Sequence, residues 1–295
     1  LHKLQFQPGI NKEGTEYSAG SSWFDSDKIR FRKGRPEKIG GWEKFSTSAF
    51  LGVSRSIHDW SSLAFTKYLG IGTHLKLYVT LGSEFKDITP IRLTTSAGDV
   101  TFAKVATGDA TITVNETDHG AVVNDFVTFS GADSLGGNII AAVLNQEYQV
   151  ASITDDDIFT IEAKDTDGDE VLADGDDSGN GGSSVVGAYQ INVGLNTYVD
   201  GSGWGNNAWN FGAWGEAPTV SSANQLRLWN QDNFGEDLIA NVRGGGVYYW
   251  DSSGGVDARA TNIADDGAGS NAPTIALHTM VSDIDKHVIC FGVNT

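Results

Sequence analysis

The stretch that decides the fold runs from Asn224 to Ile263 and reads NQLRLWNQDNFGEDLIANVRGGGVYYWDSSGGVDARATNI. Three of its segments have the short apolar or alternating pattern of β-strands: Gln225–Trp229, Asp237–Val242 and Val247–Trp250. Turn residues fill the connections at Asn230–Gly235 and Arg243–Gly246, and glycine permits the positive φ of a tight reversal. The stretch therefore predicts three antiparallel strands, which need copies of themselves or another layer to bury a face.

Copies of this pattern occur elsewhere in the chain. Leu51–Pro90 reads as strand, turn at Asp59-Trp60, strand, turn at Gly72–His74, and strand. A shift of 170 positions places Leu77-Tyr78 on Val247-Tyr248, and the apolar run Val288–Phe291 belongs to a third copy. A unit of about 40 residues with three or four strands is typical of a β-propeller blade. We expect an all-β fold with a propeller-like repeat body, and further repeats beyond the last residue.

The composition agrees with many short strands joined by glycine turns. The 295 residues include 37 Gly, 5 Pro and 10% aromatics. The single cysteine, Cys290, excludes an intrachain disulfide. No apolar run approaches 18 residues, so we expect no membrane span.

The acidity of the chain is concentrated in one region. Residues 94–188 hold 18 acidic residues against Lys104 and Lys164, a net charge of −16, whereas the remainder carries −2 of the total of −18. Such a region is unsuited to gripping a nucleic-acid backbone. We predict an arm and first repeat at 1–93, an inserted small β-sandwich or barrel at 94–188, and a Gly/Trp-rich segment with further repeats at 189–295.

The insert has five readable strands and one acidic loop. The predicted strands are Val100–Ala103, Ala110–Val114, Phe126–Phe129, Glu147–Ile153 and Phe159–Ala163, and Tyr189–Val193 would return the chain to the body. The loop Asp165–Gly182 resembles a calcium loop at its start, but Glu170 stands where an EF-hand needs glycine. A solvated, mobile loop is the preferred interpretation, and a calcium site of another kind stays open.

One strand near the N-terminus is basic. Ile29 and Phe31 alternate with cations, which predicts a strand with one basic face that ends at Gly34-Arg35-Pro36. Such a face would contact DNA or an acidic partner, or it is a solvated edge that discourages pairing. The candidate residues are Lys28, Arg30, Arg32, Lys33, Arg35 and Lys38.

Three tryptophans lie five residues apart in a Gly/Asn-rich segment: Trp204, Trp209 and Trp214. Exposed tryptophans would stack on sugars or fill a partner interface. The simpler interpretation is a loop that they pin to the repeat body.

No catalytic or cofactor motif is present. The sequence has no G-x-S-x-G, P-loop, H-E-x-x-H or dinucleotide fingerprint. Its histidines are scattered and its single cysteine has no evident base partner. We therefore expect neither an enzyme nor a cofactor.

The order of these segments resembles a known family. The chain has Pro8-Gly9-Ile10-Asn11, then Trp23–Trp42 (WFDSDKIRFRKGRPEKIGGW), then GTHLKLY at Gly72–Tyr78, and later DLIANVRGGGVYYWD at Asp237–Asp251. This arrangement resembles the tail nozzle, tail tubular or hub proteins of short-tailed, particularly marine, bacteriophages.

The insert separately resembles a small β module of phage structural proteins. The residues that carry this second resemblance are His119-Gly120, Asp125–Gly131, Tyr148–Val150 and Asp157–Ile161. The module usually has Val-Gly-Asp before its strand, whereas here the sequence is Val123-Asn124-Asp125.

The resemblance implies a virion protein that forms a homo-oligomeric, sixfold ring around a channel for double-stranded DNA. Its neighbours would be adaptor or portal-proximal proteins and tail fibres or spikes. The competing hypothesis is a carbohydrate-binding β-propeller, a lectin or adhesin, that stacks sugars on Trp204, Trp209 and Trp214. A propeller enzyme would need a carboxylate pair, which the sequence does not identify.

Overall fold

The structure is a computed structural model, and it describes residues 7–18, 22–41, 43–197, 226–265, 271–282 and 284–293. The chain forms two compact units, Leu1–Thr47 and Ser48–Thr295. Within the described ranges the regular structure consists of antiparallel sheets, one four-residue α-helix and short 3₁₀ turns, which confirms the all-β prediction. No helix in those ranges is long and apolar enough to cross a membrane.

The first unit contains a single β-hairpin. Strand β1 (Ile29–Arg32) pairs antiparallel with β2 (Arg35–Lys38), and the two are joined by Lys33-Gly34. Both turn residues have positive φ, 49° and 74°, as a type I′ hairpin turn requires. Strand β1 ends before Gly34-Arg35-Pro36, as the sequence predicts, but Arg35 and Pro36 already belong to β2. Pro36 lies opposite Phe31 in a two-stranded ribbon, where proline is tolerated.

Two four-stranded meanders form the repeat body of the second unit. The first consists of β3 (Ser54–Ser61), β4 (Lys67–Thr73), β5 (Leu77–Leu81) and β6 (Glu84–Asp87), in that order. The second consists of β15 (Trp229–Phe234), β16 (Asp237–Val242), β17 (Val247–Trp250) and β18 (Thr261–Asn262), also in chain order. Strands β5 and β17 are both third strands, as the predicted shift of 170 positions requires.

A two-stranded ladder extends the body. Strands β19 (His278–Val281) and β20 (Val288–Phe291) pair antiparallel, and the latter has the predicted bounds. Ile239 and Val247 of the second meander form a common buried cluster with Ala276 and Val281. The amide of Val281 also donates to the Asp232 carboxylate at 2.8 Å. Short 3₁₀ turns follow β17 and β18, at Ser252–Gly254 and Ile263–Asp265.

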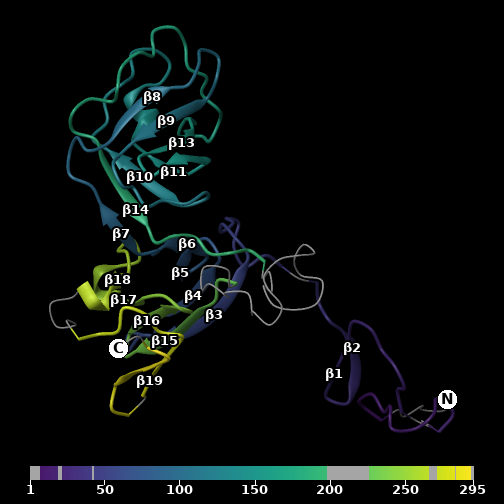
Figure 1. Ribbon diagram of the computed structural model, residues 1–295. Coiled ribbons are helices and arrows are strands. Elements are labelled where there is room, and N and C mark those ends of the chain that lie inside the picture. The colour runs from purple at the N-terminus through teal and green to yellow at the C-terminus, as the bar shows by residue number, and fades with distance from the viewer. Residues whose placement is uncertain are drawn as a thin grey trace, which may run out of the picture. The chain divides into compact units, whose positions relative to one another are not determined.

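The acidic region forms a sandwich of two four-stranded sheets, which are not closed into a barrel. One sheet has the order β11-β10-β14-β7 and the other β12-β13-β9-β8. Figure 1 shows β7 and β14 connecting it to the meanders. The elements are β7 (Ile91–Thr94), β8 (Thr101–Lys104), β9 (Thr111–Asn115), β10 (Phe126–Ser130), α1 (Ala141–Leu144), β11 (Glu147–Gln149), β12 (Ser152–Asp155), β13 (Ile158–Glu162) and β14 (Val186–Gln190).

The sandwich has its own core, and several predicted details change there. Phe102, Phe129 and Phe159 lie in one buried cluster, separate from the cluster of the meanders. The predicted strand Glu147–Ile153 is two strands that belong to different sheets. Asn124, which replaces the glycine of the module that this region resembles, has a φ of 75°. Asparagine tolerates that left-handed conformation better than most residues, so the substitution keeps the turn.

Aromatic side chains join the two meanders. The Trp60 and Trp250 rings meet edge to face with centroids 6.2 Å apart. The Trp229 indole N–H donates to the Thr73 carbonyl at 2.7 Å. A Cβ added at Gly72 would lie 2.5 Å from the Trp229 ring, so only glycine admits this approach.

Two predicted turns in the meanders are strands. Asn230–Phe234 is most of β15, and Asp59-Trp60 lies inside β3. The polar residues of β15 stay in the sheet because tertiary partners satisfy them. Gln231 donates to the Ser56 hydroxyl, and Asp232 accepts from Val281.

Candidate functional site

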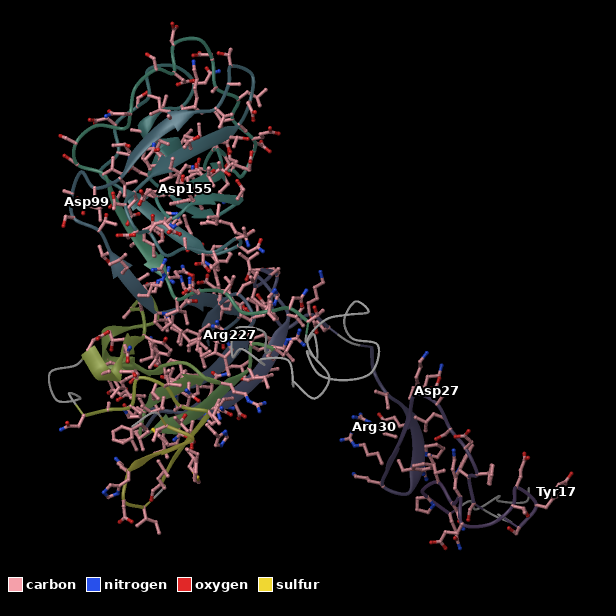
Figure 2. The ribbon with its side chains drawn as sticks, viewed as in Figure 1. Tyr17, Asp27, Arg30, Asp99, Asp155 and Arg227 are labelled. Atoms are coloured by element: carbon pink, nitrogen blue, oxygen red, sulfur yellow. The ribbon has the colours of Figure 1, made fainter. Side chains whose placement is uncertain are left out.

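The structure places the six predicted basic residues on the hairpin of the first unit, and all six are exposed. Arg30 and Arg32 share one face of β1, and their cross-strand partners are Glu37 and Arg35. Ile29 and Phe31 occupy the opposite, half-buried face. Figure 2 shows Arg30 projecting from the hairpin. The predicted alternation is therefore present.

Carboxylates neutralise part of this surface. Arg30 lies 3.4 Å from Glu37, and Lys28 lies 3.9 Å from Asp27. Within the described ranges the other four cations, Arg32, Lys33, Arg35 and Lys38, make no ion pair. Like charges directly opposite one another destabilise a ribbon, so an anionic partner would relieve the Arg32–Arg35 pair. Whether DNA or protein supplies the anions stays a prediction.

The first unit lacks a core of its own. Every residue that the structure describes between 7 and 47 is exposed or half-buried, including Tyr17, Ile39 and Phe45. The contact between the Trp23 and Phe31 rings, with centroids 6.2 Å apart, is half-buried. An isolated two-stranded hairpin is marginal in water. The unit therefore has the character of an arm that another surface would stabilise.

Exposed apolar side chains also mark the body. Leu63 and Phe65, in the turn between β3 and β4, are 88% and 87% exposed. On the β19–β20 ladder Met280, Ile289 and Phe291 each keep more than 40% of their surface exposed. Apolar residues are also exposed elsewhere in the body, and at this turn and on this ladder they lie next to one another.

A buried ion network joins the sandwich to both meanders. The Lys76 ammonium, whose side chain is 3% exposed, lies 2.7 Å from Asp87 and 2.5 Å from Glu147. Arg259 contacts the same two carboxylates, at 2.9 and 3.7 Å. Gln190 donates to Glu147 at 2.6 Å. The network thus balances two cations and two anions where β5, β11 and the segment before β18 meet.

The electrostatics of the network follow from this geometry. Burial by itself would raise the pKa of Asp87, but the charges of Lys76 and Arg259 outweigh it, so the pKa is lowered. The Lys76 ammonium also lies 4.2 Å from the centroid of the Phe126 ring in the sandwich. Sequence reasoning missed these residues because they are separated by up to 183 positions and no local pattern marks them.

Three carboxyl groups of the sandwich are buried, Glu116, Asp125 and Asp177, and the sequence did not identify them as buried. Glu116 accepts a hydrogen bond from the Tyr189 hydroxyl, and burial raises its pKa. Asp99 and Thr117 line a cavity of about 190 Å³ beside it. That volume is below the roughly 300–1,000 Å³ usual for ligand sites. Two carboxyl groups, Asp99 and Glu116, therefore line one small cavity.

The acidic loop is anchored, which corrects the prediction that all of it is solvated. Asp177 is buried, and its carboxylate accepts the amides of Gly137, Ile139 and Asp174 at 2.8–2.9 Å. Burial would raise the pKa of Asp177, but these hydrogen bonds lower it. Asp165 accepts the amides of Asp167 and Asp169. In the part of the chain that the structure describes, no three acidic, histidine or cysteine side chains converge as a metal site.

The predicted aromatic site lies outside the described residues. Trp204, Trp209 and Trp214 fall within the gap between 197 and 226. Their assignment to a sugar platform or an interface stays a prediction.

Comparisons with known proteins find no family and only weak structural similarity. No family model matches the sequence, and no curated protein matches it. Among solved structures, a phage phi92 endosialidase is similar over 84% of this chain and 35% of its own, with 13% identity and a TM-score of 0.23. A TM-score of this size does not establish a common fold, and the chain spans about a third of that protein.

Proposed function

We propose that this chain is a structural protein of a bacteriophage tail, and that its copies assemble into a ring as a nozzle or hub. The segment order described above supports the family assignment. The main support for assembly comes from the first unit. No described residue of this unit is buried, although it contains aromatic and aliphatic side chains. Such an arm gains its stability from a neighbouring copy or an adaptor protein.

The body offers surfaces for the same assembly. A ring needs two different, complementary patches on each copy, because its interfaces are heterologous. The turn with Leu63 and Phe65 and the ladder with Met280, Ile289 and Phe291 are two separate apolar patches. The basic hairpin would face DNA in the channel or an acidic neighbour. No catalysis or cofactor is invoked for this role, and the location would be the virion.

Native mass spectrometry with negative-stain imaging tests the proposal. The wild-type chain is expected to form a closed ring of about six copies with a pore wide enough for duplex DNA. The double variant Leu63→Ser/Phe65→Ser should shift the mass towards monomer without changing the melting temperature. Val105→Ser, at an exposed valine of the sandwich, is the matched control and should keep the ring.

Two outcomes would contradict the proposal. One is a wild-type chain that stays monomeric at every concentration, both alone and with phage adaptor protein. The other is a ring that the double variant and the Val105→Ser control disturb equally, which would mean that the apolar turn is not an interface.

A further inference from the structure

A cleft of about 830 Å³ opens where the sandwich and the meanders meet. Its walls come from the β4–β5 turn, the loop before β10, the chain after β14 and the β16–β17 turn. Its volume lies within the range of roughly 300–1,000 Å³ that small-molecule sites occupy. A second cavity of about 240 Å³ adjoins it and shares Asn192, Arg227, Val242 and Gly245 with it.

The ionisable side chains that line the cleft are all basic, although the chain has a net charge of −18. They are His74, Arg227 and Arg243, and Arg92 lines the adjoining cavity. None of the described lining residues of either space is an aspartate or a glutamate. None of the three arginines makes an ion pair within the described ranges. Arg227 and Arg92 are half-buried, and a partly desolvated guanidinium group without an ion pair favours the binding of an anion.

The Arg227 side chain is held in place by packing, but its guanidinium group makes few hydrogen bonds to the described residues. Its side chain packs on Gly194, where an added Cβ would lie 2.1 Å from the Arg227 Cβ. One Nη atom donates to the Asn192 carbonyl at 2.8 Å, the one hydrogen bond of this guanidinium that the described residues provide. Burial lowers the pKa of Arg227, which still leaves it charged at neutral pH. Figure 2 shows Arg227 in the second unit, on the side towards the sandwich. Its remaining N–H donors are the natural partners of an oxyanion.

Neighbouring groups do not supply that oxyanion. Asp125 lies close by, but its carboxylate already accepts from Val122, Asn192 and Val193. Arg92 donates to the His119 carbonyl at 2.9 Å, while its buried Nε has no acceptor. The fourth basic group, the His74 ring, accepts the Val53 amide at Nδ1, and burial and nearby arginines lower its pKa. At neutral pH its Nε2 therefore carries a proton and is a neutral donor.

The rest of the lining indicates what kind of anion fits. Four residues with side-chain amides line the space, Asn124, Gln149, Asn192 and Asn196, and part of their hydrogen-bonding capacity is used within the protein. The described lining contains no aromatic ring in the larger cleft, and its apolar part is aliphatic, with Val122, Val123 and Leu195 exposed. Amides suit hydroxyl groups, and a guanidinium fork suits a planar carboxylate. A ligand that is rich in hydroxyls and carries carboxylates satisfies both.

We infer that this cleft binds an acidic saccharide, with Arg243 and Arg227 on a sugar carboxylate and the amides on ring hydroxyls. The inference does not depend on the ring assembly proposed above, nor on the tryptophans of the carbohydrate-binding hypothesis. Arg243 is exposed and Arg227 is half-buried, and both line the cleft, so both can contact a carboxylate that enters it.

Calorimetric titration of the full-length chain with trigalacturonate tests the inference. Its methyl ester is the matched ligand control, because it keeps the rings and hydroxyls but removes the charge. Trigalacturonate should bind, and the ester should bind at least about 10-fold more weakly, the effect of losing one charge-assisted hydrogen bond. The substitution Arg243→Gln should weaken trigalacturonate by a similar factor. Lys67→Gln, which removes a positive charge at an exposed residue of β4 away from the cleft, should not.

Several results would overturn the inference. The first is that trigalacturonate does not bind at millimolar concentration. The second is that the methyl ester binds as tightly as trigalacturonate. The third is that the two variants lose the same affinity for trigalacturonate. A hexaglutamate peptide that binds more tightly than trigalacturonate would assign the cleft to an acidic protein segment. Arg243 lies in an exposed turn, so its replacement does not threaten the fold, and the ligand pair is informative even without variants.

Discussion

The ion network between the sandwich and the meanders gives the sharpest stability prediction. Lys76→Met keeps the length of the side chain and removes its charge. Arg259 is then left as the one cation of the network against Asp87 and Glu147. Removing one partner of a buried pair usually costs about 3–5 kcal/mol. The side chains of Asp87 and Glu147 are 20% and 30% exposed, so water screens part of the interaction with Lys76. We therefore expect Lys76→Met to lower the free energy of unfolding by about 2–3 kcal/mol.

Equilibrium urea unfolding measures this cost with two probes. Residues 94–188 contain no tryptophan, so tryptophan fluorescence reports on the rest of the chain, whereas far-UV circular dichroism reports on all strands. The wild type should show coincident transitions. The Lys76→Met chain should unfold at lower urea, and its two transitions should separate because the sandwich is less firmly coupled to the meanders.

A double-mutant cycle supplies the control and the refutation. Glu147→Gln combined with Lys76→Met leaves Asp87 balanced by Arg259, so the double variant should lose at least about 1 kcal/mol less than the sum of the singles. Lys86→Met, at an exposed lysine beside Glu84 and Asp257, should leave the midpoint unchanged. Equal midpoints for the two lysine variants, or strict additivity in the cycle, would show that water already solvates the network.

Three further predictions concern single side chains and are read from thermal or urea unfolding. Asp177→Ala should cost about 2–4 kcal/mol, since it leaves one buried and two half-buried amides without an acceptor. This cost should shrink below about pH 4, because a carboxylate of lowered pKa stabilises the fold above that pH and loses its effect as it is protonated. Glu116→Gln should raise the melting temperature at pH 8 and not at pH 4, because the raised pKa of Glu116 makes its ionisation in the fold unfavourable as the pH rises. The amide oxygen of glutamine would still accept the hydrogen bond from Tyr189. An unchanged melting temperature at pH 8 would contradict this prediction. Gly72→Ala should cost about 1–3 kcal/mol by pushing on the Trp229 ring, and Gly175→Ala, where φ is not positive and an added Cβ meets nothing, separates this clash from the loss of a glycine.

The repeat pattern was predictable where apolar residues cluster. Strands β16 and β17 have the bounds that the sequence predicts, because runs rich in aliphatic and aromatic residues flanked by glycine have few other interpretations. The register of the β1–β2 hairpin was harder to predict from the sequence. The sequence predicted a break at Gly34-Arg35-Pro36, whereas the positive φ values of Lys33 and Gly34 place the turn at these two residues, and Arg35 and Pro36 belong to the next strand.

Polar strands and long-range clusters were not predictable. In β15, Asn230–Phe234 reads as a loop because asparagine and aspartate favour turns, and its partners Ser56 and Val281 are distant in sequence. The acidic loop shows the same limit. Asp177 differs from the other acidic residues of the loop only in its hydrogen bonds to backbone amides. The amides of Gly137 and Ile139 are distant in sequence and come close to Asp177 only when the chain folds. The cleft combines residues from 74 to 245, so no local spacing reveals it.

The distribution of charge fits these tertiary contacts. The sandwich carries most of the negative charge, and the cations that meet it, Lys76, Arg92 and Arg259, come from outside the acidic stretch. Buried pairs are screened little by salt, whereas an exposed pair such as Arg30–Glu37 is screened strongly. The attachment of the sandwich should therefore persist at ionic strengths that weaken any anion bound to the hairpin. A salt titration separates the two: binding to the hairpin should fall with added salt, while the urea midpoint difference between the wild type and Lys76→Met should remain.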